Sequence, residues 1–533
     1  MSTVSAAGAA EVKSSWAARL DWFVTGDHKK IGIMYLWFAL FMGVVGGGFA
    51  GALRAQLSTP DSGLLSPELY NAFLSMHATL MIFFVMIPGW LGFGNYFVPL
   101  LIGARDMAFP RLNAFAFWMA VPAAALMFGS FFVTGGAIQT GWTAYPPLSL
   151  SAFSAGVGVD MWLLGITLVG VASILAAVNF IVTVSNMRAP GLNWFRLPLF
   201  VWAWFINATL ILVATPVLSS ALLMVLSDRV FGTGFLTVSK GGDPLLYQHL
   251  FWFYSHPAVY IMILPGFGAI SHVLASFSEK RIFGYKGMVF SLICIGIIGY
   301  LVWGHHMFVA GIPAWLQVYF SYISMVIAVP TGIKIFSWLA TIWGGSIRFT
   351  TAMKFGLGFV SLFVFGGMSG ILLANVPVDY QVHDSYFVVG HFHYVLVGGS
   401  VMAMFATTYF WYPKIRGRFL SEKLGSWVFW VFFAGINLTF FPMHFMGIMG
   451  MARRIFTYRP EFFELNVLSS FGYVLMLIAG FVFIYDVLKT SFSRVAEPLD
   501  DDPWQVDSVQ DTLDWKVSSP PPEYNFLETP KFN

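Results

Sequence analysis

Long apolar runs recur along the whole 533-residue chain and constrain its fold more than any other feature. Each run approaches the roughly 20 residues that a helix needs to cross the hydrocarbon core of a bilayer. Only 10% of the residues are charged, whereas soluble domains carry about a quarter. The runs therefore predict an all-α integral membrane protein. Twelve runs lie near residues 31–55, 71–101, 112–136, 160–186, 198–226, 246–276, 287–308, 315–342, 353–374, 385–412, 425–448 and 466–487.

The distribution of Lys and Arg predicts the orientation of these helices. If the helices alternate in direction, 21 of the 28 basic residues fall in segments on the side of the two termini. The opposite loops hold five, and two lie within runs, Arg54 and Lys334. Because basic loops remain in the cytoplasm, both termini are expected inside, and the protein is expected in a bacterial inner membrane. No signal peptide is expected, since no apolar stretch precedes Trp22, and no basic patch indicates nucleic acid.

The chain is expected to form a single catalytic domain with two short flanking segments. Residues 28–490 show no fixed-period repeat and no shift in composition, and residues 1–27 form an inner N-terminal segment. Residues 491–533 are acidic and proline-rich, so this tail is expected to lie on the inner face or on a partner. The single cysteine, Cys294, falls within an apolar run, which predicts a buried thiol without a disulfide partner in the chain.

Six of the eleven histidines are predicted to share one layer of the membrane. A rise of about 1.5 Å per residue along the alternating helices places all six in the outer half. A histidine inside a bilayer is costly. A single one could form a hydrogen bond between helices. Histidines from four helices distant in sequence, all at one depth, instead predict a buried metal centre. The six are His77, His256, His305, His306, His391 and His393.

The spacing of these residues divides them between metals. His391 and His393 point about 200° apart on a helix, so one helix can serve two cofactors. The adjacent His305 and His306 suit two ligands of one copper or zinc ion. Tyr260 lies four residues after His256 and therefore on the same helix face. Its predicted position is too deep in the membrane for an interface tyrosine. A phenol at this place can supply a proton and an electron.

If three histidines hold a single ion, His77 remains to pair with His391 or His393. Such a pair predicts a six-coordinate heme that transfers electrons. The histidine left over would hold a five-coordinate heme with an open position for oxygen. The residues alone do not distinguish iron porphyrin from other metals.

Segments that contain these residues closely resemble subunit I of the heme-copper oxidases. In order along nearly the whole chain they are DHKKIGIMY, HATLMIFF, GFGNYFVPLLIGARDMAFPRLN, GWTAYPPLS, DPLLYQHLFWFYSHPAVYIMILPGFG, VWGHHMF, PTGIKIFSWLAT, HDSYFVVGHFHYVL, NLTFFPMHFMG and TLDWKVSSPPPEYNF. The resemblance implies a twelve-transmembrane-helix bundle that encloses two hemes and a copper ion. It also implies four-electron reduction of O2 to water coupled to proton pumping.

The resemblance assigns a ligand role to each histidine of the layer. His77 and His393 match the axial ligands of the low-spin heme, and His391 matches the ligand of the high-spin heme. The other three match the copper ligands, with Tyr260 linked covalently to His256. Heme a is the family default at both sites, although heme o or b would use the same histidines.

Further matches lie around the hemes and at the outer edge. Arg54 matches the arginine that meets the formyl group of the low-spin heme, although Gln56 replaces the usual glutamate. Arg453 and Arg454 match the pair that neutralises heme propionates, with surface salt bridges as the alternative. The remaining matches are Trp142 and Trp252 beside the hemes, Asp379 at the cofactor, and His383 and Asp384 as magnesium ligands, for which a loop turn is the alternative.

Two proton routes from the inner side are implied. Lys334 is predicted in the inner half of its helix, where lysine is rare; snorkelling to the interface is the alternative. Together with Thr331, Ser271 and Tyr260 it matches the family's lysine pathway. The matches to the aspartate pathway are Asp106, Asn95, Asn113, Asn179 and Ser173.

One departure from the family concerns the helix of His256. Most relatives carry a glutamate two residues after this histidine, where the chain has Ala258, and no predicted span contains a glutamate. The sequence resembles the subfamily in which a tyrosine and a serine replace that glutamate. We hypothesise that Tyr254 and Ser255 relay protons through water.

The electron donor is expected to be cytochrome c rather than quinol. Quinol-oxidising members carry an acidic residue, a histidine and a glutamine at positions that match Gly51, Leu69 and Ala72. Cytochrome c would act through a dinuclear copper site on subunit II, because this chain has no cysteine pair. Subunit III, other oxidase subunits, a fused or dedicated cytochrome c domain and a respiratory supercomplex are further expected partners.

Two other functions were weighed against an oxidase. A nitric oxide reductase would lack Lys334 and the pair of His256 and Tyr260, and would carry glutamates near its metal. A twelve-helix transporter would be expected to show internal repeats and broken helices at the midplane. Neither pattern is present in the sequence.

Overall fold

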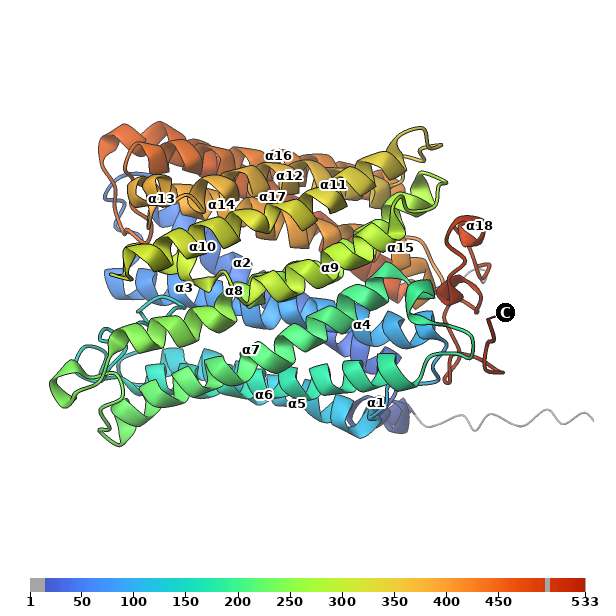
Figure 1. Ribbon diagram of the computed structural model, residues 1–533, viewed down its shortest axis with the longest axis horizontal. Coiled ribbons are helices and arrows are strands. Elements are labelled where there is room, and N and C mark those ends of the chain that lie inside the picture. The colour runs from blue at the N-terminus through green and yellow to red at the C-terminus, as the bar shows by residue number, and fades with distance from the viewer. Residues whose placement is uncertain (1–14, 494–498, 533) are drawn as a thin grey trace, which may run out of the picture.

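Long helices run side by side through the computed structural model, which describes residues 15–493 and 499–532 (Figure 1). Eleven helical segments are long and apolar enough to cross a membrane: α2 (His28–Gln56), α3–η1–α4 (Pro67–Ile102), α5–η2 (Pro110–Phe132), α6 (Val157–Asn186), α7 (Leu199–Val230), α8 (Pro244–Phe277), α10–α11 (Ala314–Ile342), α12 (Thr351–Leu373), α14–η6–α15 (Tyr386–Arg416), α16 (Glu422–Ile448) and η7–α17 (Pro460–Phe492). The shorter α9 (Tyr285–Gly299) completes the set. The predicted all-α bundle of twelve helices is confirmed.

The seventh predicted run differs from a regular helix at its end. The α-helix stops at Gly299, and His305 and His306 lie in a separate 3₁₀ turn, η5 (Trp303–Met307). A side chain at residue 299 would have its Cβ 3.0 Å from the ring of Tyr260, so glycine permits a close approach here. Adjacent residues of an α-helix point about 100° apart. His305 and His306 lie in the 3₁₀ turn, and there the imidazoles of two adjacent residues meet at one point.

Two of the spanning segments contain a π-helical turn. In the second, η1 (Leu80–Met86) joins α3 (Pro67–Thr79) to α4 (Ile87–Ile102); in the tenth, η6 (Leu396–Val401) joins α14 (Tyr386–Val395) to α15 (Met402–Arg416). Such turns are frequent at functional sites. Both follow directly on a helix that carries histidines of the predicted layer.

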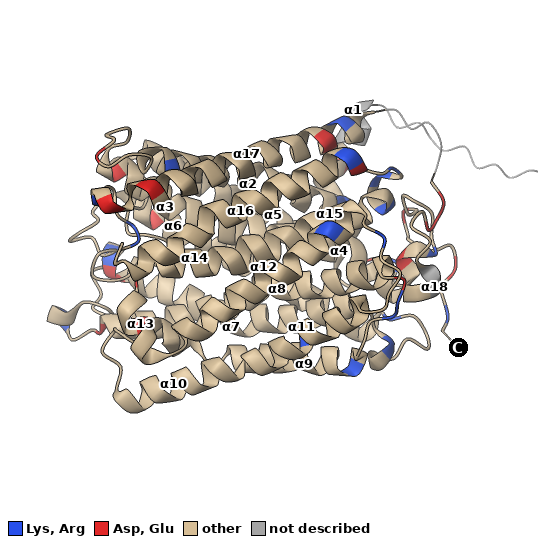
Figure 2. Ribbon diagram, turned by 90° about the horizontal axis from the view of Figure 1, so that it is seen from above, with Lys and Arg blue, Asp and Glu red and all other residues tan. Residues whose placement is uncertain are grey.

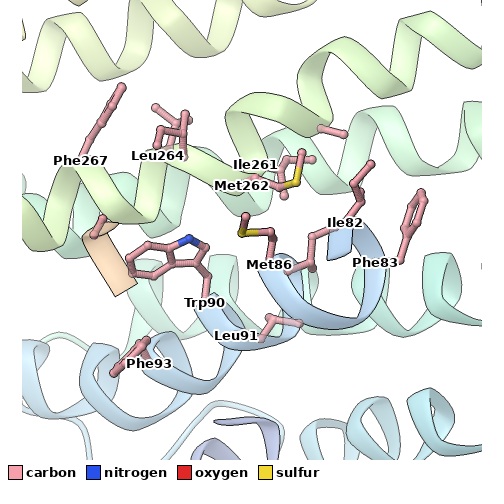
Figure 3. Close-up of a cluster of buried hydrophobic side chains, with 14 of the residues drawn as sticks. Ile82, Phe83, Met86, Trp90, Leu91, Phe93, Ile261, Met262, Leu264 and Phe267 are labelled. Atoms are coloured by element: carbon pink, nitrogen blue, oxygen red, sulfur yellow. The ribbon is translucent and has the colours of Figure 1, made fainter. Parts of the chain in front are cut away.

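The core between these segments is filled by large apolar side chains (Figure 3). Trp90 of α4 is buried, and its indole N–H donates to the hydroxyl of Ser400 at 2.8 Å. That hydroxyl in turn donates to the carbonyl oxygen of Met262 at 2.6 Å. This chain of hydrogen bonds joins α4, η6 and α8, the segments that surround the site.

Most Lys and Arg side chains lie at one end of the bundle, beside α1 (Ser15–Val24), α15 and α18 (Asp507–Gln510) (Figure 2). Residues 499–532 pack across this end, which we call the tail end. Trp411 donates to Asp514 at 2.9 Å, and Asn525 donates to the carbonyl oxygen of Ala104 at 2.9 Å. The division into residues 1–27, 28–490 and 491–533 stays a prediction; residues 1–14, 494–498 and 533 lie outside the described residues.

The prediction of a buried thiol was wrong. Cys294 is exposed on the outer surface of α9. An apolar run that crosses a bilayer has one face toward lipid, so an apolar sequence context does not by itself imply burial within the protein.

Candidate functional site

One large cavity lies between the helices. Its volume is about 2150 Å³, whereas ligand pockets typically reach roughly 1,000 Å³. All six histidines of the predicted layer line it, from α3, α8, η5 and α14: His77, His256, His305, His306, His391 and His393. The structure therefore brings together residues that are up to 316 positions apart in the chain.

Three of these imidazoles converge on one point. The Nδ1 atom of His256 lies 3.2 Å from Nε2 of His306, which lies 3.1 Å from Nε2 of His305. Within residues 15–493 and 499–532, they form the only group of three His, Cys, Asp or Glu whose ligand atoms all lie within 4.8 Å of one another. Nitrogens held tetrahedrally about 2.0 Å from a metal would be about 3.3 Å apart. The spacing fits a single ion.

The neighbours of this cluster fix the orientation of its rings. The hydroxyl of Ser324 donates to the carbonyl oxygen of Phe320 and so accepts from Nδ1 of His305 at 2.8 Å. The Nε2 atom of His305 therefore carries the lone pair that a metal requires. Trp252 stacks on His306 with ring centroids 3.8 Å apart and planes 11° apart. These contacts fix the orientation of two of the three imidazoles.

The other three histidines share one hydrogen-bond pattern. Each donates from Nδ1 to a backbone carbonyl oxygen: His77 to Gly46 at 2.8 Å, His391 to Gly366 at 3.0 Å and His393 to Val389 at 2.8 Å. A proton on Nδ1 leaves Nε2 as the lone-pair nitrogen. Metal-bound histidines typically use their second nitrogen in this way.

The two histidines of α14 face different partners. The Nδ1 atom of His391 lies 3.0 Å from the hydroxyl oxygen of Ser369 on α12, whereas His393 faces α16. The ring of His393 also stacks on Phe440, with centroids 4.3 Å apart. The arrangement agrees with the separation of about 200° between residues two apart on a helix.

Tyr260 lies beside the three-imidazole cluster. Its ring centroid is 4.7 Å from that of His256, one turn earlier on α8, and the two planes are 64° apart. Both residues line the cavity. The phenol is therefore a neighbour of one of the three converging imidazoles.

Arg54 reaches the cavity from α2 and has one unused nitrogen. Its Nη2 donates to the carbonyl oxygen of Asn466 at 2.7 Å and to the hydroxyl of Ser470 at 2.9 Å. The Nη1 atom is buried and has no hydrogen-bond partner among the described residues, so it can donate to an oxygen of a bound group. Gln56 instead accepts from the backbone N–H of Leu65 at 2.9 Å.

A charged cluster closes the end of the cavity opposite the tail end. Arg453 forms an ion pair with Asp384, and Nδ1 of His383 lies 3.2 Å from a carboxylate oxygen of Asp379. Burial acts to raise the pKa of Asp384, but Arg453, His383 and Arg454 hold it below its ordinary value. Burial, followed by repulsion from Arg453, lowers the pKa of Arg454 to about 10. Two guanidinium groups thus line the cavity, and that of Arg453 is paired with a carboxylate.

The two predicted tryptophans are in contact. Trp142 meets Trp252 edge-on, with centroids 6.2 Å apart and planes 87° apart. The indole N–H of Trp252 donates to the hydroxyl of Tyr145. Because Trp252 also stacks on His306, the pair joins the three-imidazole cluster to the loop after α5.

Lys334 lies on α11 (Ala328–Ile342) and is 1% exposed. Its ammonium does not reach the surface, contrary to the alternative of snorkelling. Thr331, one turn earlier, lines the cavity and donates to the carbonyl oxygen of Ile327 at 2.8 Å. Ser271 of α8 accepts from Trp338 of α11 at 2.9 Å.

The predicted aspartate route begins in the loop between α4 and α5. Burial raises the pKa of Asp106 in this loop to about 6. Nearby, the side-chain amide of Asn113 donates to the amide oxygen of Asn95 at 2.6 Å. The structure therefore pairs the two asparagines at the tail end.

The two residues predicted on α6 differ in their contacts. The amide oxygen of Asn179 accepts from the backbone N–H of Phe109 at 2.9 Å, which joins α6 to the loop of Asp106. Ser173 is buried, and its hydroxyl donates to the carbonyl oxygen of Val169, one turn back on its own helix. Asn179 thus contacts the loop, whereas the hydroxyl of Ser173 bonds to its own helix.

The hydroxyl pair of α8 is divided between two environments. Ser255 lines the cavity, and its buried hydroxyl has no hydrogen-bond partner. Tyr254 packs against Phe83 of η1, with ring centroids 6.3 Å apart and planes 8° apart. Ala258 lines the cavity at the position of the missing glutamate.

Sequence reasoning missed the groups that hold the histidines. Ser324 contacts His305, and Ser369 lies 3.0 Å from Nδ1 of His391. A serine inside an apolar run is a polar group at membrane depth, and that signal could have marked both. Backbone carbonyl oxygens carry no such signal.

A family model described as Cytochrome C and Quinol oxidase polypeptide I matches residues 30–482. Cytochrome c oxidase subunit 1 of Synechocystis sp. is 49% identical over 504 residues, which cover 95% of this chain and 90% of that protein. Quinol oxidase subunit 1 of Bacillus subtilis is 44% identical over 514 residues, which cover 96% and 78%.

The fold also matches a solved structure of a heme-copper terminal oxidase dimer determined by cryo-electron microscopy. The TM-score is 0.75 over 88% of this chain and 85% of that chain. At 20% sequence identity, this likeness concerns the fold alone.

Proposed function

The chain belongs to the family of cytochrome c and quinol oxidase polypeptide I, and from this premise we propose that it is the catalytic subunit of a proton-pumping terminal oxidase. The reaction proposed is O2 + 4 e⁻ + 4 H⁺ → 2 H2O. The observation that carries the proposal is the convergence of three imidazoles beside Tyr260, in a cavity that His391 also lines.

The histidines fit the metal groups that the family requires. The three converging imidazoles would hold copper, His77 and His393 would hold the low-spin heme, and His391 the high-spin heme. Their free Nε2 atoms and the large cavity support this distribution. Bound there, the hemes and copper would supply the electrons and the site at which oxygen is reduced. Heme a is proposed at both sites.

Tyr260 would provide a proton and an electron from its phenol to the oxygen chemistry. The proposed covalent link to His256 replaces one C–H and one N–H bond by a C–N bond. Its formation releases two protons and two electrons, which O2 accepts. The adjacent rings on α8 support this role.

The remaining charged and aromatic groups would hold the cofactors in place. The unused Nη1–H of Arg54 would donate a hydrogen bond to the heme formyl group. Arg453 and Arg454 would pair with propionates, with Asp379 beside them. His383 and Asp384 would bind magnesium. Trp142 and Trp252 would pack beside the hemes, an assignment supported by the stacking of Trp252 on His306.

Two proton routes would begin at the tail end, which we propose faces the cytoplasm. One comprises Lys334, Thr331, Ser271 and Tyr260. The other comprises Asp106, Asn95, Asn113, Asn179 and Ser173. The contacts among Asn95, Asn113 and the loop of Asp106 support the second route.

Replacing Asp106 with asparagine is expected to change both turnover and the pH dependence of stability. Ionisation of Asp106 costs stability as the pH rises from about 4 to 6, since its pKa is about 6 here against about 3.9 in an unfolded chain. The Tm of Asp106→Asn relative to wild type should therefore rise over this range and level off above it. Oxygen consumption should fall by on the order of tenfold or more. A constant Tm difference from pH 4 to 7 would contradict the burial of this carboxyl group.

The double variant Tyr254→Phe/Ser255→Ala is expected to turn over about tenfold more slowly and to lose pumping, because the proposed hydroxyl relay is removed. Oxygen uptake and proton release by reconstituted vesicles measure the two effects. Tyr35→Phe removes the hydroxyl of a different buried tyrosine, which lies on α2, and should leave turnover and pumping unchanged. Normal turnover with intact pumping in the double variant would refute the relay.

Cytochrome c acting through subunit II is the proposed donor. A side chain at Gly51 would have its Cβ 2.6 Å from the hydroxyl of Tyr473, so an acidic residue there would have to displace that ring. Leu69 borders a small pocket lined only by apolar residues. Quinol is the alternative donor, because the chain is also similar to the quinol oxidase subunit 1 of Bacillus subtilis. Subunit III, a dedicated cytochrome c domain and a respiratory supercomplex remain proposed partners, in a bacterial inner membrane.

The first test is a reduced-minus-oxidised spectrum of the purified protein, with extracted hemes identified and copper counted. Two hemes, at least one of type a, with copper and a carbon monoxide-sensitive band support the oxidase. Iron in place of copper would favour nitric oxide reduction. Absence of heme would overturn the proposal.

A further inference from the structure

The ammonium group of Lys334 is held in an unusual environment. It is buried in α11 and has no hydrogen-bond partner in the described part of the chain. An unpaired ammonium in a membrane protein interior is costly. Something other than hydrogen bonds must therefore determine where it rests.

Two aromatic rings meet this ammonium. Its Nζ lies 5.4 Å from the ring centroid of Phe267 on α8 and 5.5 Å from that of Trp338 on α11. Both distances are within the roughly 6 Å at which a cation is attracted by a ring face. Such attraction is strongest where water is excluded, and both rings are buried. The position of Phe267 on α8 is visible in Figure 3.

Ser271 holds one of these rings. Its hydroxyl donates to the carbonyl oxygen of Phe267 at 2.7 Å, so it accepts the indole N–H of Trp338 at 2.9 Å. The only proton of the hydroxyl is thereby engaged with its own helix. Ser271 thus acts on Lys334 through the orientation of Trp338 rather than by direct contact.

No charged neighbour competes with the rings. The helices α8, α9, α10 and α12 pack against α11. Their ionisable side chains are Tyr247, His249, Tyr254, His256, Tyr260 and His272 on α8, Tyr285, Lys286 and Cys294 on α9, Tyr319 and Tyr322 on α10, and Lys354 on α12. In the described part of the chain, none of them forms a hydrogen bond with the Lys334 ammonium.

We propose that Phe267 and Trp338 form an aromatic seat that positions the protonated Lys334 for proton transfer, with Ser271 as the residue that orients the seat. This inference deepens the lysine pathway proposed above and rests on it. The rings stabilise the charged form without accepting its proton, so the proton remains available for transfer. Trp338 and Phe267 are positioning residues in this scheme.

The test is the pH profile of oxygen consumption by the complete, reconstituted oxidase. Trp338→Leu removes a ring face, so Lys334 should lose its proton at lower pH. The alkaline limb of the profile should therefore shift to lower pH by about one unit, which is the shift expected from the loss of a desolvated cation–π interaction. Trp338→Phe keeps a ring and should shift the limb less. Phe267→Leu should shift it in the same direction as Trp338→Leu.

Phe359→Leu is the matched control. Its ring contacts Trp338 at 5.4 Å and Phe267 at 6.1 Å but is not one of the rings over Lys334. The variant should therefore leave the profile in place. Equal shifts in Phe359→Leu and Trp338→Leu would show a packing effect and overturn the seat.

Lys334→Met separates failure of the seat from failure of the pathway. If it is inactive but no ring variant moves the profile, the seat alone is wrong. If it keeps wild-type oxygen consumption, the pathway is wrong and the seat with it. Absence of oxygen consumption in the wild-type complex would contradict the proposed oxidase function itself and the functional role of the seat.

Discussion

His306→Ala is expected to lose bound copper and to lower oxygen consumption by about three orders of magnitude, since a bound metal supplies several kcal/mol of stabilisation. His306 is the central member of the cluster, within 3.2 Å of both other ligand nitrogens. Its loss leaves two imidazoles, too few for a firmly held ion. Metal analysis and an oxygen electrode measure the two effects on the same sample.

The low-spin heme should survive this substitution. Its proposed ligands, His77 and His393, keep their own carbonyl partners. The spectrum should therefore retain the low-spin band and lose carbon monoxide-sensitive oxygen chemistry. The matched control is His444→Ala, which removes another buried histidine outside the cluster. Full copper content in His306→Ala would contradict the assignment of the copper ligands.

The fold could be predicted largely because a bilayer admits few structures. Each apolar run must satisfy its own backbone, so length and composition suffice to place a helix. The details that depend on packing were not predictable in this way. The end of α9 at Gly299 and the π-helical turns η1 and η6 arise where helices approach closely around the cavity.

The histidine layer could be predicted because several rare residues fell at one depth. The same counting could not predict ring orientation. That depends on the carbonyl oxygens of Gly46, Gly366 and Val389 and on the hydroxyl of Ser324. Cys294 shows the opposite error, because hydrophobicity along a run does not say which face meets lipid.

The proton routes depend on contacts that spacing does not reveal. Ser271 was placed in the lysine pathway by resemblance, yet its hydroxyl accepts a hydrogen bond from the indole N–H of Trp338. Asn525, from the far end of the chain, lies near the loop of Asp106 and bonds to Ala104. Neither contact could be deduced from periodicity, because both join segments distant in sequence.

Lys334→Met is expected to lower oxygen consumption by on the order of 10² or more, because it removes the one intramembrane ammonium that can carry a proton on its route. The fold should tolerate the change. Methionine is flexible and similar in length, and it packs well against the aromatic rings of Phe267 and Trp338. Heme and copper contents should match those of wild type.

The same variant should be more stable than the wild type. The Lys334 ammonium has no hydrogen-bond partner among the described residues, so the two rings offset only part of its desolvation cost, and a well-packed apolar side chain carries no such cost. The Tm should therefore rise while activity is lost, which a merely disruptive substitution would not produce. Thermal unfolding followed by heme absorbance measures the first effect, and an oxygen electrode the second. A lower Tm together with lower activity would instead mean that Lys334 supports the structure, and the lysine would lose its proposed place in proton transfer.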